Sequence, residues 1–86
     1  MGNPRAFECE LIGQEDLGCS YVLASNRDSA RYATALSAHD AGYLSRPNPA
    51  LVRCRRSPQH DLSLQSAKQD FPYSADYLHH ATSQEH

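Results

Sequence analysis

The sequence predicts an α+β fold: a two-layer ββαβ unit in which a three-stranded antiparallel sheet packs against one helix. Polar and apolar residues alternate over 5–12 and again over 51–56, as they do in half-buried strands. Between these segments, residues 26–41 are rich in alanine and contain neither Gly nor Pro, which indicates a helix. A chain of 86 residues has room for one small core. We therefore predict a single domain with a ββαβ core at 1–56 and a C-terminal arm at 57–86 that packs on the core or on a partner.

The first two strands are predicted to form a β-hairpin. Alternate residues of the first strand divide between an apolar face and an acidic face: Phe7, Cys9 and Leu11 on one side, Glu8 and Glu10 on the other. A polar segment follows at 13–18, with a glycine at each end that can adopt a positive φ. The apolar run at 19–24 then supplies the returning strand.

The predicted helix has recognisable ends. Ser25 fits an N-cap with the acidic Asp28 three positions later, and Gly42 suits the left-handed residue that follows a helix. The spacing predicts which side chains face the sheet: Ala30, Ala33, Leu36, Ser37 and Ala41, with Tyr32 at the border. It also predicts side chains that face water: Arg31, Thr34, Ala38 and His39.

Two prolines within residues 43–50 predict a loop before the third strand. In the strand at 51–56, alternate residues face in and out: Val52 and Cys54 inward, Arg53 and Arg55 outward. A crossover through the helix makes this strand parallel to the second strand. If it pairs with the first strand, the sheet has the order 2-1-3.

The C-terminal arm is predicted to be irregular or to form short helical turns near 62–69 and 74–80, because its apolar residues are spread through a polar background. Two alternatives remain open for Phe71, Tyr73 and Tyr77. Either they cover the open face or edge of the sheet, or the arm stays partly disordered until a partner binds it. The last residues of the chain are expected to fray.

The three cysteines are an odd number without a close pair, which argues against a disulfide framework and favours free thiols in a reducing compartment. Cys9 and Cys54 fall on the inner faces of their strands, so we interpret them as small buried hydrophobes. The N-terminus lacks the pattern of a secretory signal, and no apolar run is long enough to span a membrane. We therefore expect a cytoplasmic protein that does not enter membranes. A monomer of this size would be marginally stable, so a homodimer is a further expectation.

The sequence contains none of the common catalytic or nucleotide-binding motifs, such as G-x-S-x-G, a P-loop or H-E-x-x-H. The cysteines lie far apart, and the adjacent His79 and His80 would diverge on any regular element, so the spacing does not predict a metal site. A small core also leaves little concave surface for a substrate. We therefore expect no enzymatic activity, no catalytic residues, no cofactor and no metal.

Charge is distributed unevenly along the chain, although the formal net charge is only -2. Residues 27–56 carry six arginines against two aspartates, whereas residues 1–26 and 57–86 each carry one cation against four acids. The arginines of the middle segment could form a cationic surface on one edge of the fold. The alternative is that Glu8 and Glu10, on the neighbouring strand, neutralise the outward arginines by cross-strand pairing.

Four short segments carry a resemblance to a known group of proteins: Val22-Leu23-Ala24, Ala30-Arg31-Tyr32, Ala41-Gly42-Tyr43 and Val52-Arg53-Cys54-Arg55. Through them, residues 19–56 resemble small accessory proteins encoded by tailed phages and prophages. The resemblance implies a mobile-element protein made in the cytoplasm of a bacterial host cell. Such proteins frequently act by stoichiometric binding, including inhibition of host defence complexes such as CRISPR effectors. The resemblance supplies no catalytic or binding residues.

Our preferred hypothesis is a non-enzymatic, phage-type binding protein that occludes a site on a bacterial host protein or ribonucleoprotein complex. Its candidate contact residues are Glu8, Glu10, Glu15, Asp16, Arg53, Arg55, Tyr73 and Tyr77. The acidic members could meet a nucleic-acid channel lined by Lys and Arg, because opposite potentials steer encounter. The alternative is a small nucleic-acid-associated regulator that places its arginines on phosphates: Arg27, Arg31, Arg53, Arg55 and Arg56.

Overall fold

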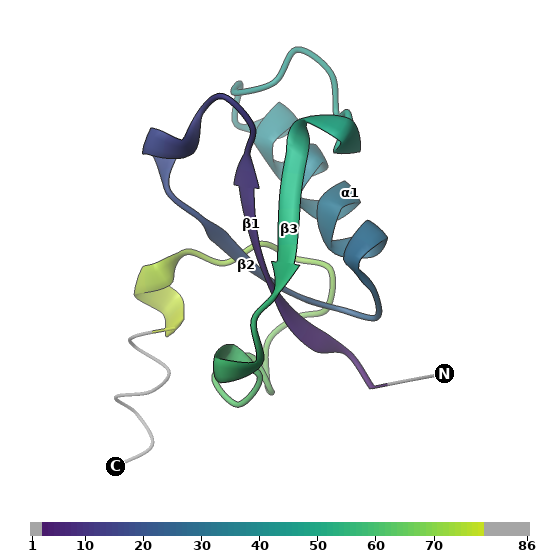
Figure 1. Cartoon of the computed structure of the whole chain (residues 1–86), viewed down its shortest axis with the longest axis vertical. Helices are drawn as coiled ribbons and strands as arrows, with labels where there is room; N and C mark the ends of the chain where they lie inside the picture. The colour runs from purple at the N-terminus through teal and green to yellow at the C-terminus, as the bar shows by residue number, and fades with distance from the viewer. Residues whose placement is uncertain (1–2, 79–86) are drawn as a thin grey trace.

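The chain folds into a three-stranded antiparallel sheet that is covered on one face by a helix (Figure 1). In this computed structural model, which describes residues 3–78, the sheet consists of β1 (Arg5–Leu11), β2 (Ser20–Ala24) and β3 (Val52–Arg56). β1 lies in the centre and pairs antiparallel with both neighbours, in the order β2-β1-β3. The helix α1 (Arg27–Asp40) connects β2 to the loop before β3. The predicted α+β class and strand order are confirmed, and each predicted strand is correct to within one residue.

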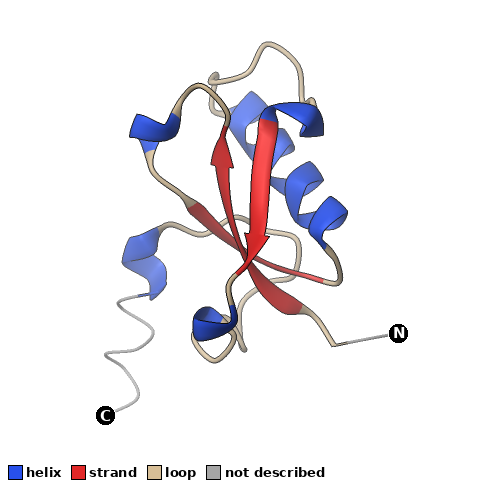
Figure 2. Cartoon of the chain, viewed as in Figure 1, coloured by secondary structure: helices blue, strands red, loops and turns tan. Residues whose placement is uncertain are grey.

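Three short 3-10 turns complete the connections (Figure 2). They are η1 (Glu15–Leu17) after β1, η2 (Pro49–Leu51) before β3, and η3 (Pro58–His60) after β3. The chain enters the η1 turn through Gly13, whose φ of 86° favours a residue without a Cβ atom. The predicted loop at 43–50 is irregular until η2 begins.

The helix begins one residue later than predicted, because Asn26 caps it in place of Ser25. The Oδ1 atom of Asn26 accepts a hydrogen bond from the Ser29 N–H at 2.8 Å and satisfies one of the free amides of the first turn. The helix ends at Asp40, and Gly42 follows with the predicted positive φ, at 89°.

The helix face that packs on the sheet differs from the predicted one. Its buried residues are Ala30, Ala33, Thr34, Ala35 and Ala38. The prediction that Leu36, Ser37 and Ala41 face inward is wrong, because all three are exposed. Thr34 and Ala38, which were expected to face water, are buried instead. Only small side chains fit where the helix lies close to the sheet, and the Thr34 hydroxyl donates at 2.9 Å to the carbonyl four residues earlier.

The sheet carries a hydrophobic cluster on each face. The cluster beneath α1 contains inward side chains of all three strands: Phe7, Cys9, Leu11, Val22, Ala24, Val52 and Cys54. The second cluster, on the opposite face, consists of Ala6, Leu23, Leu64 and Leu78. Leu64 is fully buried there, so the described part of the arm adds a partial third layer to the predicted two.

The arm also covers the outer edge of β2. Tyr21 and Tyr73 exchange two backbone hydrogen bonds of 2.8 Å, and the Asp70 N–H donates to the Leu23 carbonyl at 2.8 Å. Of the two alternatives for the arm, the structure therefore supports the one in which it covers the sheet. The chain is helical over 75–78, and the predictions for the residues that follow lie outside the described part of the chain.

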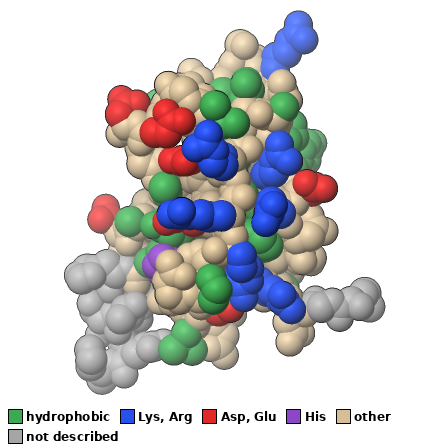
Figure 3. All heavy atoms as spheres, in the orientation of Figure 1, with side chains coloured by type: hydrophobic (Ala, Val, Ile, Leu, Met, Phe, Trp, Pro, Cys, Tyr) green, Lys and Arg blue, Asp and Glu red, His purple; other side chains and the backbone are tan. Residues whose placement is uncertain are grey.

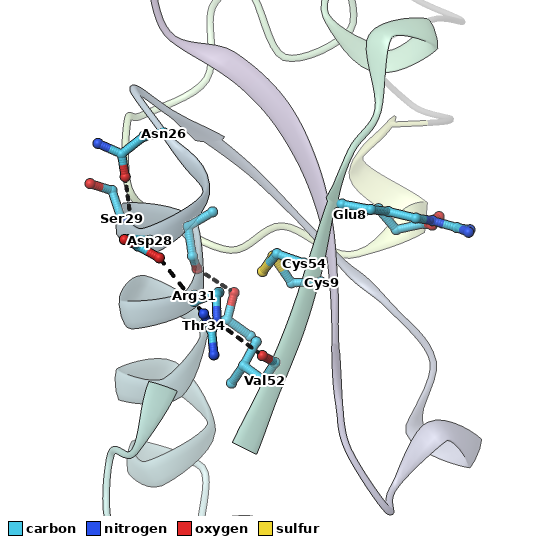
Figure 4. Close-up of a disulfide and its surroundings, with 11 residues drawn as sticks. Glu8, Cys9, Asn26, Asp28, Ser29, Arg31, Thr34, Val52 and Cys54 are labelled. Atoms are coloured by element: carbon cyan, nitrogen blue, oxygen red, sulfur yellow. Dashed lines mark hydrogen bonds and ion pairs between the residues drawn. A yellow bond between two sulfur atoms is a disulfide. The ribbon is translucent and has the colours of Figure 1, made fainter. Parts of the chain in front are cut away.

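Two of the three cysteines are joined, because a Cys9–Cys54 disulfide links β1 to β3 (Figure 4). The two residues face each other in the strand register, with their Cα atoms 4.1 Å apart. The expectation of free thiols is wrong for this pair, because a sequence separation of 45 residues conceals their direct opposition in the sheet. Cys19 is free. Disulfides persist in oxidising compartments, so the cysteine count no longer supports a reducing location.

Candidate protein-binding surface

The exposed part of the second sheet face carries two cross-strand ion pairs. Glu8 and Arg55 face each other in the β1–β3 register, and the Arg55 Nε donates to the Glu8 Oε1 at 2.6 Å. Two residues along, Arg53 donates to the Glu10 Oε1 at 3.2 Å. In Figure 4 the labelled Glu8 lies on the side of the sheet away from the disulfide. The cross-strand neutralisation that the sequence offered as an alternative is confirmed.

A phenol and a thiol lie beside these ion pairs. The Tyr21 hydroxyl donates to the Glu8 Oε2 at 3.0 Å, and burial followed by this hydrogen bond raises the pKa of Tyr21. Cys19 lines a small pocket with Glu8 and Glu10. Burial, and after it the charges of these two carboxylates, raise the pKa of the Cys19 thiol. A thiol with a raised pKa carries a smaller fraction of the reactive thiolate at neutral pH.

The other two acidic candidates, Glu15 and Asp16, lie on the exposed turn η1. The Glu15 Oε2 accepts a hydrogen bond from the Gly13 N–H at 3.0 Å, and this bond is the main reason that the pKa of Glu15 is lowered. The four acidic candidates therefore divide into two that are ion-paired on the sheet and two on an exposed turn.

The aromatic candidates Tyr73 and Tyr77 are half-buried against the second cluster. Their ring centroids lie 4.2 Å apart, and the Tyr73 hydroxyl accepts a hydrogen bond from the Lys68 N–H at 3.0 Å. Phe71 lies at the rim, 5.0 Å from the Tyr73 ring, and is 46% exposed. The two tyrosines thus hold the arm on the sheet, and their part in partner binding stays a prediction.

Arg56 lies at the junction of β3 with the arm. Its guanidinium donates two hydrogen bonds to the Asp61 carboxylate, at 2.7 and 2.5 Å, and a third to the Ala6 carbonyl at 3.1 Å. The Ala6 N–H donates to the Asp61 Oδ1 at 2.9 Å. The Arg56 hydrogen bond is the main cause that lowers the pKa of Asp61. This network ties β1, β3 and the arm together and engages most of the hydrogen-bonding capacity of Arg56.

Three other arginines, Arg27, Arg31 and Arg53, gather where β3 meets the first half of α1. An open groove of about 250 Å³ is lined by Ile12, Arg27, Arg31, Val52, Arg53 and Cys54. Arg31 reaches from α1 to β3, because its Nε donates to the Val52 carbonyl at 3.2 Å while its Nη1 lies 3.7 Å from Asp28 (Figure 4). Figure 3 shows Lys and Arg side chains gathered over β3 and the adjoining flank of α1. We call Arg27, Arg31, Arg53 and the outer edge of β3 between them the arginine edge.

Sequence reasoning grouped five arginines into one cationic surface on an edge of the fold, but it did not separate those that line a groove from those that are ion-paired outside it. The structure brings Arg27, Arg31 and Arg53 to the same groove and places Arg55 and Arg56 in ion pairs outside it. The predicted order 2-1-3 already implied that the third strand has a free edge. This strand order could therefore have predicted that the groove lies beside β3.

No protein-family model, curated protein or solved structure matches the chain. Within residues 3–78, no three His, Cys, Asp or Glu side chains are grouped to hold a metal ion. No helix in that range is long and apolar enough to cross a bilayer. A function has to be inferred from the geometry and charge of the surface.

Proposed function

We propose that this protein is a non-enzymatic module that binds a partner protein stoichiometrically through the arginine edge. The observation that carries the proposal is a groove in which Arg27, Arg31 and Arg53 lie beside an edge strand of the sheet. Opposite charges across an interface steer encounter and set the register of the two partners. The expected partner therefore presents acidic side chains at its contact surface.

The ion pairs of the neighbouring arginines favour a protein partner over nucleic acid. Arg53, Arg55 and Arg56 each pair with a carboxylate of the same chain, and the formal net charge of the protein is -2. Binding to phosphates grows with the number of cations that a protein presents without compensation. A small nucleic-acid-associated regulator is the second candidate, because Lys and Arg gather on one face in Figure 3.

The resemblance of residues 19–56 to phage accessory proteins suggests a bacterial host protein or ribonucleoprotein complex as the partner, including a CRISPR effector. A protein that occludes an acidic site on such a complex acts by occupancy and needs no turnover. The phage origin, this class of target and a location in the bacterial cytoplasm are parts of the proposal.

A matched pair of charge reversals tests the proposal. Arg27→Glu changes the arginine edge, whereas Arg46→Glu makes the same charge change at an exposed residue outside the groove. Each variant and the parent protein are used to capture partners from a bacterial lysate by chemical crosslinking, followed by mass spectrometry. We expect the parent and Arg46→Glu to retain the same partner in a fixed ratio and Arg27→Glu to lose it.

Two results would contradict the proposal. Equal capture by all three proteins would show that the arginine edge is not the contact surface. Recovery of nucleic acid, with an affinity that falls steeply as salt rises, would favour the regulator instead.

A further inference from the structure

The backbone of β3 presents every second residue to the outside of the sheet. At the two ends of the strand, the Leu51 carbonyl and the Ser57 N–H each bond to the β1 segment at 2.9 Å. Because the direction of backbone groups alternates along a strand, the odd-numbered residues bond to β1 and the even-numbered residues point away. The 4.1 Å between the Cα atoms of Cys9 and Cys54 agrees, since pairs without mutual hydrogen bonds approach most closely.

The outward backbone groups of β3 belong to Val52, Cys54 and Arg56. Those of Val52 already form hydrogen bonds, because its N–H donates to the Pro49 carbonyl and its carbonyl accepts from Arg31. Within residues 3–78, the outward backbone groups of Cys54 and Arg56 have no hydrogen-bond partner. The fold covers its other edge, β2, with its own arm. Among residues 3–78, one sheet edge is therefore covered by the chain itself, and no strand pairs with the other.

Arginines lie on both sides of this free edge. Arg27 and Arg31 stand on the α1 side, whereas Arg53 and Arg55 stand on the opposite face of the sheet. The side chains of an added strand alternate between these two sides, so a carboxylate on the α1 side meets Arg27 and Arg31, and one on the other side meets guanidiniums that already pair with Glu10 and Glu8. A second copy of β3 would place arginines against arginines, which disfavours the predicted homodimer at this edge.

We propose that the arginine edge binds an extended acidic segment of a partner protein by β-strand addition. This inference rests on the proposed function and specifies its binding mode. The backbone of the incoming segment bonds to Cys54 and Arg56, and its Asp or Glu side chains pair with the arginines on both sides. The backbone hydrogen bonds supply affinity that depends little on sequence, and the charges select acidic segments.

The test uses the peptide Thr-Glu-Val-Glu-Val-Glu-Thr, blocked at both ends, titrated into the isotope-labelled full-length protein and followed by NMR. We expect the amides of Cys54 and Arg56 to shift and to become protected from hydrogen exchange. The Ser57 amide already bonds to β1 and should keep its protection. A matched peptide with Lys in place of Glu should bind at least about ten-fold more weakly.

Two N-methylated forms of the acidic peptide test the backbone contact directly. One carries the methyl groups on the Glu residues and the other on the Val residues. In any one orientation of the bound peptide only one of these two sets of N–H groups faces β3, so at least one form should bind about ten-fold more weakly than the parent peptide.

Several outcomes would overturn the inference. These are unchanged Cys54 and Arg56 amides at millimolar peptide, affinities of both N-methylated forms equal to that of the parent peptide, or equal affinity of the Glu and Lys peptides. A decathymidine oligonucleotide that shifts the same amides more strongly than the acidic peptide would overturn it in favour of nucleic acid. If partner capture still depends on Arg27 in any of the first three cases, the proposed function stands and only the binding mode fails.

Discussion

Removal of the Cys9–Cys54 disulfide should cost this small protein a large share of its stability. The disulfide joins residues 45 positions apart, which corresponds to about 4 kcal/mol in the chain-entropy model of the unfolded state. A domain of 86 residues has a total free energy of unfolding of only about 4–13 kcal/mol. With an unfolding entropy of about 0.18 kcal/mol/K for a chain of this length, the loss should lower Tm by about 20 °C.

The assay is thermal unfolding followed by circular dichroism, with and without a thiol reductant. The double variant Cys9→Ala/Cys54→Ala should have the lowered Tm both with and without reductant. The parent protein should have this lowered Tm only when its disulfide is reduced. Cys19→Ala is the matched control, because Cys19 is free and its loss should leave Tm and its dependence on reductant unchanged. A parent Tm that reductant shifts by less than about 5 °C would refute this account of the disulfide.

Three further perturbations follow from the arm and the ion-paired face. Leu64→Ala should destabilise the fold by about 2–4 kcal/mol in urea unfolding, because Leu64 is fully buried in the second cluster. Arg56 lowers the pKa of Asp61 in the folded state, so the stabilisation from this pair is complete above the unfolded pKa of about 4 and is lost as pH falls through the lower folded value. Asp61→Asn should therefore lower the stability slightly at neutral pH and make the stability depend less on pH in this acidic range. Iodoacetamide should alkylate Cys19 slowly at neutral pH because its pKa is raised, and Glu8→Gln should accelerate the reaction by removing one raising charge.

Matched variants separate these effects from general damage. Leu62→Ala removes the same atoms at a side chain that is 65% exposed and should change stability little. Asp76→Asn removes a carboxylate from an exposed position of the arm, and an acid-unfolding curve equal to that of Asp61→Asn would contradict the role of the Arg56 pair. Asp16→Asn should leave the alkylation rate of Cys19 unchanged, since Asp16 is not among the groups that shift its pKa.

Much of the architecture could be predicted because it is encoded in local periodicity. Alternation over a few residues identifies a strand and its two faces, which is why the opposition of Glu8 and Glu10 to Arg53 and Arg55 could be anticipated once the strand order was inferred. The helix and its termination before Gly42 follow from alanine content and the allowed φ of glycine. These features depend on residues close together in the sequence, or on the single inference that the third strand pairs with the first.

The rotation of α1 could not be predicted in this way. Hydrophobicity favoured Leu36 on the inner face, but the distance between helix and sheet admits only small side chains and turns Thr34 and Ala38 inward. The burial of Thr34 depends on a hydrogen bond inside the helix, which a hydrophobicity pattern does not register.

The sequence by itself determined the elements, their order in the sheet and the chemistry of each strand face. The tertiary structure alone decided that Cys9 meets Cys54, that the arm covers β2, and that Arg27, Arg31 and Arg53 line one groove beside the β3 edge, which no other strand pairs with among residues 3–78. The physical reason is the distance along the sequence between the residues that make contact. Strand and helix patterns arise from contacts within a few residues, whereas a disulfide, a covered edge and a charged groove require segments far apart in the chain to meet, and no local pattern specifies which ones do.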